Sequence, residues 1–182
     1  TILGGSGVGK SVTLKLLIGL LKPDRGHILF DGEHVERMGP KELQRLRQRV
    51  GMVFQGAALF DSMTVRENVA YGLREHYKMS EAEIDERVAW SLSLVGLPGV
   101  EPMNPADLSG GMRKRVGLAR TIALQPEVLL YDEPTTGLDP INITRINNLI
   151  LSLKAALNNT AVVVTHDMTT ASTVSDRLAM VH

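Results

Sequence analysis

The sequence predicts an α/β fold with a mostly parallel sheet and an inserted helical subdomain. Short apolar runs typical of strands alternate along the chain with longer stretches whose apolar residues have helical spacing. The runs Val128–Tyr131 and Ala161–Val164 lack polar alternation, as expected for parallel strands that are buried on both faces. Helix-like stretches then follow one another without an intervening strand, which places the helical subdomain at residues 56–123.

Each element has its own signal in the sequence. The expected strands are Ile28–Phe30, Val50–Phe54, Val128–Tyr131 and Ala161–Val164, with further strand-like runs at residues 1–3 and 177–182. The expected helices are Lys10–Leu21, Pro40–Gln48, Thr64–Arg74, Ser80–Val95, Gly110–Ala123, Ile141–Leu157 and Met168–Val174. Thr64 and Ser80 each precede a glutamate by three residues, which is the spacing of a helix capping box.

The composition is that of one globular domain, which we expect to occupy all of residues 1–182. Hydrophobic residues make up 43% of the chain, enough for a substantial core. Lys plus Arg and Asp plus Glu both number 20, so the net charge of zero argues against general binding of polyanions. The chain has no cysteine, which excludes disulfides and thiolate metal sites.

Membrane spans and targeting signals are not expected. Lys15 interrupts the apolar stretch Leu14–Leu21, which is also much shorter than the roughly 20 residues that cross a bilayer. Because residue 1 leads straight into a motif, we also expect no signal peptide. We expect the chain to begin inside a strand, and the run at residues 177–182 stops without a turn signal, so the expected domain is truncated at both ends.

The stretch "GGSGVGKS" at residues 4–11 has the phosphate-binding loop pattern, between a strand and a helix, and predicts a P-loop NTPase core. Backbone N–H groups and the helix dipole would surround the β-phosphate. Lys10 would reach the β- and γ-phosphates of ATP, and the Ser11 hydroxyl would bind Mg²⁺. The alternative is a glycine-rich turn that only caps a helix. The expected nucleotide-binding residues are Gly4, Gly5, Ser6, Gly7, Val8, Gly9, Lys10, Ser11 and Val12.

A second signal is the apolar run "VLLYDEP", which ends in Asp132 and Glu133. An aspartate at the carboxyl edge of a parallel sheet is placed to hold Mg²⁺ beside the phosphate loop. Glu133 would then orient an attacking water. Taken alone, such an acidic pair is also compatible with a solvated turn.

Three further motifs follow in order: "LSGGMRKR", "TTGLD" and "VVVTHD". With the phosphate loop, this set resembles the ATP-binding subunits of ABC transporters over nearly the whole chain, whereas the loop alone leaves kinases, GTPases and helicases open. The resemblance implies that Ser109, Gly110 and Gly111 contact ATP held by a second copy of the chain. It also implies that Asp139 lies at the seam between the copies.

The resemblance assigns roles to two more residues. Gln55 in "VGMVFQ" matches the glutamine that senses the γ-phosphate and Mg²⁺, and His166 matches the switch histidine. Taken alone, these residues are also compatible with a surface amide and a structural histidine. The implied catalytic residues are Lys10, Gln55, Glu133 and His166, and the implied metal ligands are Ser11, Gln55 and Asp132.

The chain departs from the family pattern at two positions. Val12 replaces the usual second hydroxyl after the lysine and serine, which removes a side-chain contact to the α-phosphate. Met112 replaces the usual glutamine of the signature, which removes a polar group but leaves the contacts of Ser109 and Gly111 possible. Drift within an ordinary importer ATPase is one interpretation of Met112.

The motif "LSGGM" together with "FQGAALFDSMTVRENVAYGLREH" and "LLYDEPTTGLDP" resembles the subfamily that drives Mce-associated phospholipid transport, the Mla type. That resemblance implies a second ATP-binding copy, a transmembrane permease, a lipid-binding Mce-type component, and a peripheral location on the cytoplasmic face of the inner membrane. Alternatives are the ATPase of a small-solute importer or a soluble ABC ATPase acting on DNA or ribosomes. A module that binds ATP without hydrolysis is a further alternative, against which Glu133 and His166 argue.

Two surface features complete the expectations. The segment 56–76, with Phe60 and Met63, is the candidate docking surface for the permease, and helix packing within the subdomain is the alternative. The basic run Arg113–Arg115 is expected to be a solvated helix face, because no aromatic residues are interleaved with it. We therefore expect no nucleic-acid partner.

Overall fold

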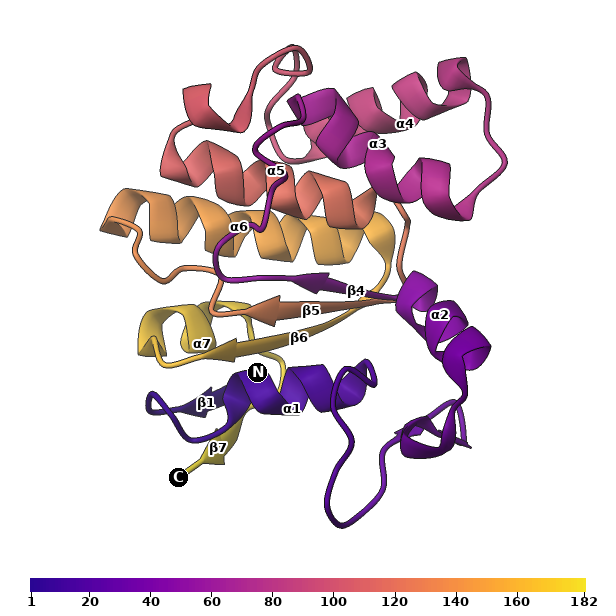
Figure 1. Cartoon of the computed structure of the whole chain (residues 1–182). Helices are drawn as coiled ribbons and strands as arrows, with labels where there is room; N and C mark the ends of the chain where they lie inside the picture. The colour runs from indigo at the N-terminus through magenta and orange to yellow at the C-terminus, as the bar shows by residue number, and fades with distance from the viewer.

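A computed structural model describes residues 1–182 and contains one central sheet. Its strands lie in the order β4-β5-β6-β1-β7, and every neighbouring pair is parallel (Figure 1). The strands are β1 (Ile2–Gly4), β4 (Val50–Val53), β5 (Val128–Asp132), β6 (Thr160–Thr165) and β7 (Ala179–Val181). The expected α/β fold with a mostly parallel sheet is thereby confirmed.

Helices cover both faces of the sheet. One face packs on α1 and α2 through a cluster of seven buried residues that includes Leu14 and Leu46. The opposite face packs on α3, α5, α6 and α7 through a cluster of 23 buried residues. The α-helices are α1 (Lys10–Leu17), α2 (Pro40–Arg49), α3 (Val65–His76), α4 (Glu81–Leu94), α5 (Gly110–Ile122), α6 (Pro140–Leu157) and α7 (Met168–Val174). The 3₁₀-helices are η1 (Val35–Arg37) and η2 (Pro105–Asp107).

The helices α3, α4 and α5 follow one another between β4 and β5, and Figure 1 shows α3 and α4 stacked beyond α5 on one side of the sheet. Both capping boxes are present. The Thr64 hydroxyl accepts the Glu67 N–H at 3.2 Å, and the Glu67 carboxylate accepts the Thr64 N–H at 2.8 Å. Ser80 and Glu83 make the same reciprocal pair. These helices share their apolar core with the sheet, because Val69 and Leu129 belong to one cluster.

Besides the two 3₁₀-helices, which were not expected, and shifts of one or two residues at other ends, two elements differ from expectation. The helix α1 ends at Leu17 rather than Leu21, because Gly19 turns the chain with a φ of 64° and Arg47 binds the carbonyls of Ile18 and Gly19. An antiparallel hairpin, β2 (Leu29–Phe30) and β3 (Glu33–His34), was expected only as a single strand. The Asp31-Gly32 pair at its tip has positive φ at both residues, which a tight two-residue hairpin turn requires.

The parallel arrangement brings the candidate site residues to one edge of the sheet. The carboxyl ends of β1, β4, β5 and β6 lead directly into the phosphate loop, Gln55, Glu133 and His166, respectively. In open α/β sheets, ligands bind at the carboxyl ends of the strands. None of the helices combines the length and apolar character that a bilayer crossing demands.

Candidate functional site

The phosphate loop curls around the ammonium group of Lys10. The Lys10 Nζ donates hydrogen bonds to the carbonyls of Gly4 and Gly5, each at 2.8 Å. Lys10 is only 6% exposed, so these bonds satisfy a buried ammonium group. A Cβ at Gly4 would lie 2.6 Å from the Val181 carbonyl of the neighbouring strand, so packing within the chain excludes a side chain there. A Cβ at Gly5 would meet no atom within 4 Å. The lack of a side chain at Gly5 therefore leaves the backbone open to a ligand.

Glu133 joins the buried Lys10 to the half-exposed His166 in one cluster. Its Oε1 lies 3.2 Å from Lys10 Nζ, and its Oε2 lies 2.8 Å from His166 Nδ1. Thr136 donates its hydroxyl to the same Oε2 at 3.1 Å. The Glu133 backbone has a φ of 50°, which is uncommon for a residue with a side chain, and its N–H donates to the Val164 carbonyl at 3.0 Å. Such backbone strain is typical of functional sites.

The surroundings of Glu133 keep its carboxylate ionised. Burial raises the pKa of Glu133, but the hydrogen bonds from His166 and Lys10 and the charges of these groups outweigh it, so the net pKa is lowered. A carboxylate in this state is an acceptor for the proton of a water molecule.

Ser11 and Asp132 form a second polar pair beside the loop. The Ser11 hydroxyl donates to Asp132 Oδ1 at 2.6 Å, and Asp132 is 7% exposed. Gln55 lines the same cavity as Ser11 and adds an amide. Hydroxyl, carboxylate and amide oxygens are the donors that Mg²⁺ prefers, so the residues present here fit this ion.

A cavity of about 360 Å³ lies over these two groups of residues. Its size and polar lining suit a bound polyphosphate. It is lined by Ser6, Gly7, Gly9, Lys10, Ser11, Val12, Gln55, Glu133, Thr136 and His166. Residues far apart in the sequence, from Ser6 to His166, thus share one cavity, while Asp132 lies buried behind Ser11.

The residues expected to act on a second copy lie outside this cavity. Ser109 caps α5, where its hydroxyl accepts the Met112 N–H at 3.3 Å. Asp139 caps α6, where one carboxylate oxygen accepts the N–H groups of Ile141 and Asn142, each at 3.0 Å. Both side chains are exposed. The two helix starts adjoin each other, because a Cβ at Gly111 would lie 3.6 Å from Asn142 Oδ1.

Sequence reasoning missed Thr136 and wrongly described the surroundings of the basic run Arg113–Arg115. Thr136 was not singled out, although the run "DEPTTG" places a hydroxyl three residues after Glu133. The basic run was expected to be solvated, and this expectation is wrong for two of its three residues. Lys114 donates to the Pro134 and Thr136 carbonyls at 3.2 and 2.7 Å, and Arg115 donates to the Val95 and Gly96 carbonyls. Burial lowers the pKa of Lys114, and the Glu133 charge opposes that shift.

The two departures from the family pattern differ in their surroundings. Val12 is 47% exposed and lines the cavity, so the missing hydroxyl removes a polar contact at the site itself. Met112 is partly buried and packs against the large apolar cluster. Its side chain therefore contributes to the core beneath the start of α5.

Known proteins with similar sequences point to one family. A family model described as "ABC transporter" matches residues 1–136. The "Probable ribonucleotide transport ATP-binding protein mkl" of Mycobacterium leprae is 48% identical over 98% of this chain and 52% of its own length. The "Intermembrane phospholipid transport system ATP-binding protein MlaF" of Haemophilus influenzae is 45% identical over 96% of this chain and 66% of its own length. The chain thus spans about half to two thirds of these relatives.

A solved structure shows the same similarity at the level of the fold. It is described as "Dimeric structure of a post-hydrolysis state of the ATP-binding cassette MJ0796 bound to ADP and Pi". It superposes with a TM-score of 0.89 at 34% identity and covers 99% of this chain and 79% of that one. The chain therefore belongs to the ABC transporter family and has the fold of an ATP-binding cassette.

Proposed function

We propose that this chain binds ATP with Mg²⁺ and hydrolyses it as the energy-supplying subunit of a transporter. The observation that carries the proposal is the position of Glu133, whose ionised carboxylate borders the cavity between Lys10 and His166. A buried carboxylate beside a phosphate-binding loop can orient a water molecule and accept its proton.

Each residue of the cavity has a distinct task in this proposal. The loop N–H groups and Lys10 bind the phosphates and stabilise the charge that develops on the γ-phosphoryl oxygens. Ser11, Asp132 and Gln55 hold Mg²⁺, which supplies further charge neutralisation when it is bound. His166 orients Glu133 through Nδ1 and, being half exposed in the cavity, contacts the terminal phosphate.

Glu133→Gln tests the role of the carboxylate. The amide keeps the shape but cannot accept the proton, so we expect hydrolysis to fall by about 10² to 10⁴ while ATP stays bound. Glu86→Gln, at an exposed position on α4, is the matched control. The measurement is ATP turnover by the full-length protein in its complex. Unchanged turnover in Glu133→Gln would exclude this role.

We further propose that two copies of the chain close around the nucleotide. The exposure of Ser109, Gly110 and Asp139 supports this, as does the absence of any atom within 4 Å of a Cβ at Gly110. The start of α5 can therefore approach a phosphate held by another chain, which its helix dipole favours. The dimeric form of the similar cassette agrees with this arrangement.

Mixing two inactive variants tests the two-copy arrangement. Lys10→Ala should abolish phosphate binding by the loop of its own chain. Ser109→Arg should block the contact that the start of α5 makes with the nucleotide held by the partner chain. A mixed dimer has one site in which both residues are intact, so we expect mixing to restore ATP turnover. No recovery after verified subunit exchange would show that each site belongs to a single chain.

We propose that the permease docks in a groove of about 440 Å³ beside α3 and the segment that precedes it. Phe60 and Tyr71 line it with ring centroids 5.0 Å apart, and the guanidinium of Arg120 lies 5.8 Å from the Phe60 ring. Exposed aromatic rings around a groove suit an amphipathic helix from a membrane subunit. Phe60→Glu should uncouple ATP turnover from transport. Met63, outside the groove lining, should tolerate the same change better, and intact coupling in Phe60→Glu would place the surface elsewhere.

For the cargo, we propose phospholipid, with a lipid-binding Mce-type component and a peripheral position on the cytoplasmic face of the inner membrane. The likeness to the phospholipid transport protein supports this, and the likeness to the ribonucleotide transport protein favours a different cargo. Mass spectrometry of the complex purified with its membrane subunits distinguishes phospholipid from ribonucleotide as the cargo. Copurified phospholipid that leaves on ATP turnover is expected, and ATP-dependent transport of a nucleotide instead would overturn the assignment.

A further inference from the structure

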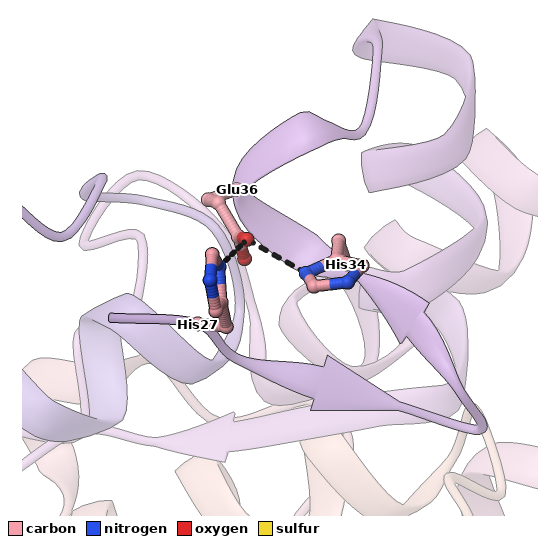
Figure 2. A group of neighbouring side chains, drawn as sticks. All are labelled: His27, His34 and Glu36. Atoms are coloured by element: carbon pink, nitrogen blue, oxygen red, sulfur yellow. Dashed lines mark hydrogen bonds and ion pairs between the residues drawn. The ribbon is translucent and has the colours of Figure 1, made fainter. Parts of the chain in front are cut away.

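A cluster of metal-ligand side chains lies on the β2–β3 hairpin and contains His27, His34 and Glu36. Figure 2 shows the two imidazole rings on either side of the Glu36 carboxylate. Each ring places Nδ1 at 2.9 Å from the same oxygen, Glu36 Oε1. One ligand atom from each of the three residues lies within 4.8 Å of the other two. None of these residues lines the cavity of the phosphate loop.

The register of the hairpin brings these residues together. Leu29 pairs with His34, and the Val35 N–H donates to the Ile28 carbonyl at 2.9 Å, which continues the pairing beyond the strands. One step further, His27 lies opposite Glu36. His34 is the last residue of β3, and Glu36 follows in η1. The backbone pairing of the hairpin therefore brings together His27, which precedes β2, and the first residues after β3.

The carboxylate at the centre is fixed and charged. Glu36 Oε2 accepts the Ile28 N–H at 3.2 Å, which leaves Oε1 directed between the two rings. A glutamate carboxylate is anionic at neutral pH, where imidazole is largely neutral, so these three groups can act together as metal ligands.

We propose that His27, His34 and Glu36 form a binding site for a divalent transition-metal ion, with Zn²⁺ as the preferred occupant. Two imidazoles and one carboxylate form a donor set that binds Zn²⁺ with a fourth position open to water. The exposure of His27, at 61%, leaves room for that fourth ligand. Imidazole donors favour Zn²⁺, Cu²⁺ or Ni²⁺ over Mg²⁺ and Ca²⁺, so this site is chemically distinct from the oxygen donors of Ser11 and Asp132.

Coordination needs the two His–Glu contacts to widen and the two imidazole donors, which lie within 4.8 Å of each other, to approach the spacing of a tetrahedral site. Ligand bonds of about 2.0–2.2 Å in a tetrahedron place donor atoms about 3.4 Å apart. The two contacts of 2.9 Å would therefore widen by about half an ångström as the ion replaces the shared protons. The Ile28 N–H already supplies the outer-shell contact that orients the carboxylate. The bound ion would tie the residue before β2 to η1 and stabilise the hairpin.

The test is titration of the full-length, nucleotide-free protein with Zn²⁺ in the presence of excess Mg²⁺. We expect one Zn²⁺ per chain and a rise in thermal unfolding temperature that follows the occupancy. His27→Gln and His34→Gln should each weaken Zn²⁺ binding by at least about tenfold. Glu36→Gln should do the same while its amide oxygen still accepts the Ile28 N–H. The matched control is His76→Gln, because His76 is exposed on α3 outside the cluster.

Two outcomes would overturn the proposal. One is a lack of Zn²⁺ binding to the unmodified protein, which would leave the three residues as a hydrogen-bonded cluster only. The other is equal binding by His27→Gln and the unmodified protein, as expected for Zn²⁺ held by His166 and Glu133. X-ray absorption of the unmodified Zn²⁺-loaded protein provides a second readout that needs no variant, since the site predicts two imidazole ligands and no sulfur.

Discussion

The Nδ1 atom of His166 lies 2.8 Å from Oε2 of Glu133 and ties the end of β6 to the end of β5. The His166 N–H approaches the same oxygen at 3.4 Å. Lys10 holds the other carboxylate oxygen from the side of the phosphate loop. The carboxylate at the end of β5 is thus fixed from two sides, by His166 after β6 and by Lys10 at the start of α1, and its orientation depends on both neighbours.

Replacing His166 should reduce turnover more than nucleotide binding. In His166→Gln, the Glu133 carboxylate loses its contact with the ring, and misplacement of a reacting group costs on the order of 10² in rate. We expect kcat to fall by that order while ATP affinity changes little. His76→Gln is the control, and both constants are measured with the full-length protein in its complex. An equal loss of affinity and turnover would show that His166 acts mainly through its contact with the terminal phosphate and not through the orientation of Glu133.

Replacing Lys114 should lower both the unfolding free energy of the protein and its ATP turnover. Lys114→Met removes the donor to the Pro134 and Thr136 carbonyls, and unsatisfied buried acceptors cost about 1–3 kcal/mol of unfolding free energy. The same change should lower ATP turnover, because these carbonyls belong to the segment directly after Glu133. Arg113→Met, at the exposed neighbouring position, should change neither quantity. Urea unfolding and turnover assays check both, and equal stability of the two variants contradicts the structural role.

The parts of the fold that follow from local signals were predictable from the sequence. Unalternating apolar runs located β5 and β6, and the pairs Thr64/Glu67 and Ser80/Glu83 located the starts of α3 and α4. The end of α1 was not predicted, because it depends on Arg47, which approaches from α2. The second strand of the hairpin could have been found from Asp31-Gly32, a pair typical of tight turns.

The candidate site likewise combines residues that local motifs identify with residues that only the tertiary fold brings together. The loop and the acidic strand end are contiguous motifs, so Lys10, Ser11, Asp132 and Glu133 could be proposed as site residues from the sequence. Lys114 could not, because its role depends on how α5 packs over the segment that follows β5. The juxtaposition of His27 with Glu36 depends on hairpin register, which became visible only with the pairing of β2 and β3.

The pKa of Glu133 predicts how the stability of the protein varies with pH. Because its pKa is lower in the folded chain than the unfolded value of 4.5, the ionised group stabilises the fold above about pH 4.5. This contribution is lost as the pH falls through the lowered folded pKa. We expect the stability difference between the unmodified protein and Glu133→Gln to be largest above pH 5 and to shrink below pH 4.5. Urea unfolding at several pH values measures it, and a constant difference argues against the ion pair with Lys10.

Alanine substitutions at the two adjacent glycines of the loop should separate folding from nucleotide binding. In Gly4→Ala, the new Cβ would lie 2.6 Å from the Val181 carbonyl, a clash with the backbone of β7 that costs about 1–3 kcal/mol. In Gly5→Ala, the new Cβ meets nothing within 4 Å, so the unfolding free energy should stay within about 0.5 kcal/mol.

The two variants should therefore be impaired in different properties, Gly5→Ala in ATP affinity and Gly4→Ala in stability. Gly5→Ala places a methyl group on the backbone that would face the phosphates, so a folded protein with reduced ATP affinity is expected. Gly4→Ala should lose stability first, because its glycine is required by the neighbouring strand. Urea unfolding and calorimetric titration with ATP measure the two quantities on the same samples. Wild-type ATP affinity in Gly5→Ala would show that the phosphates do not approach the loop at this residue, since nothing else in the chain fills that space.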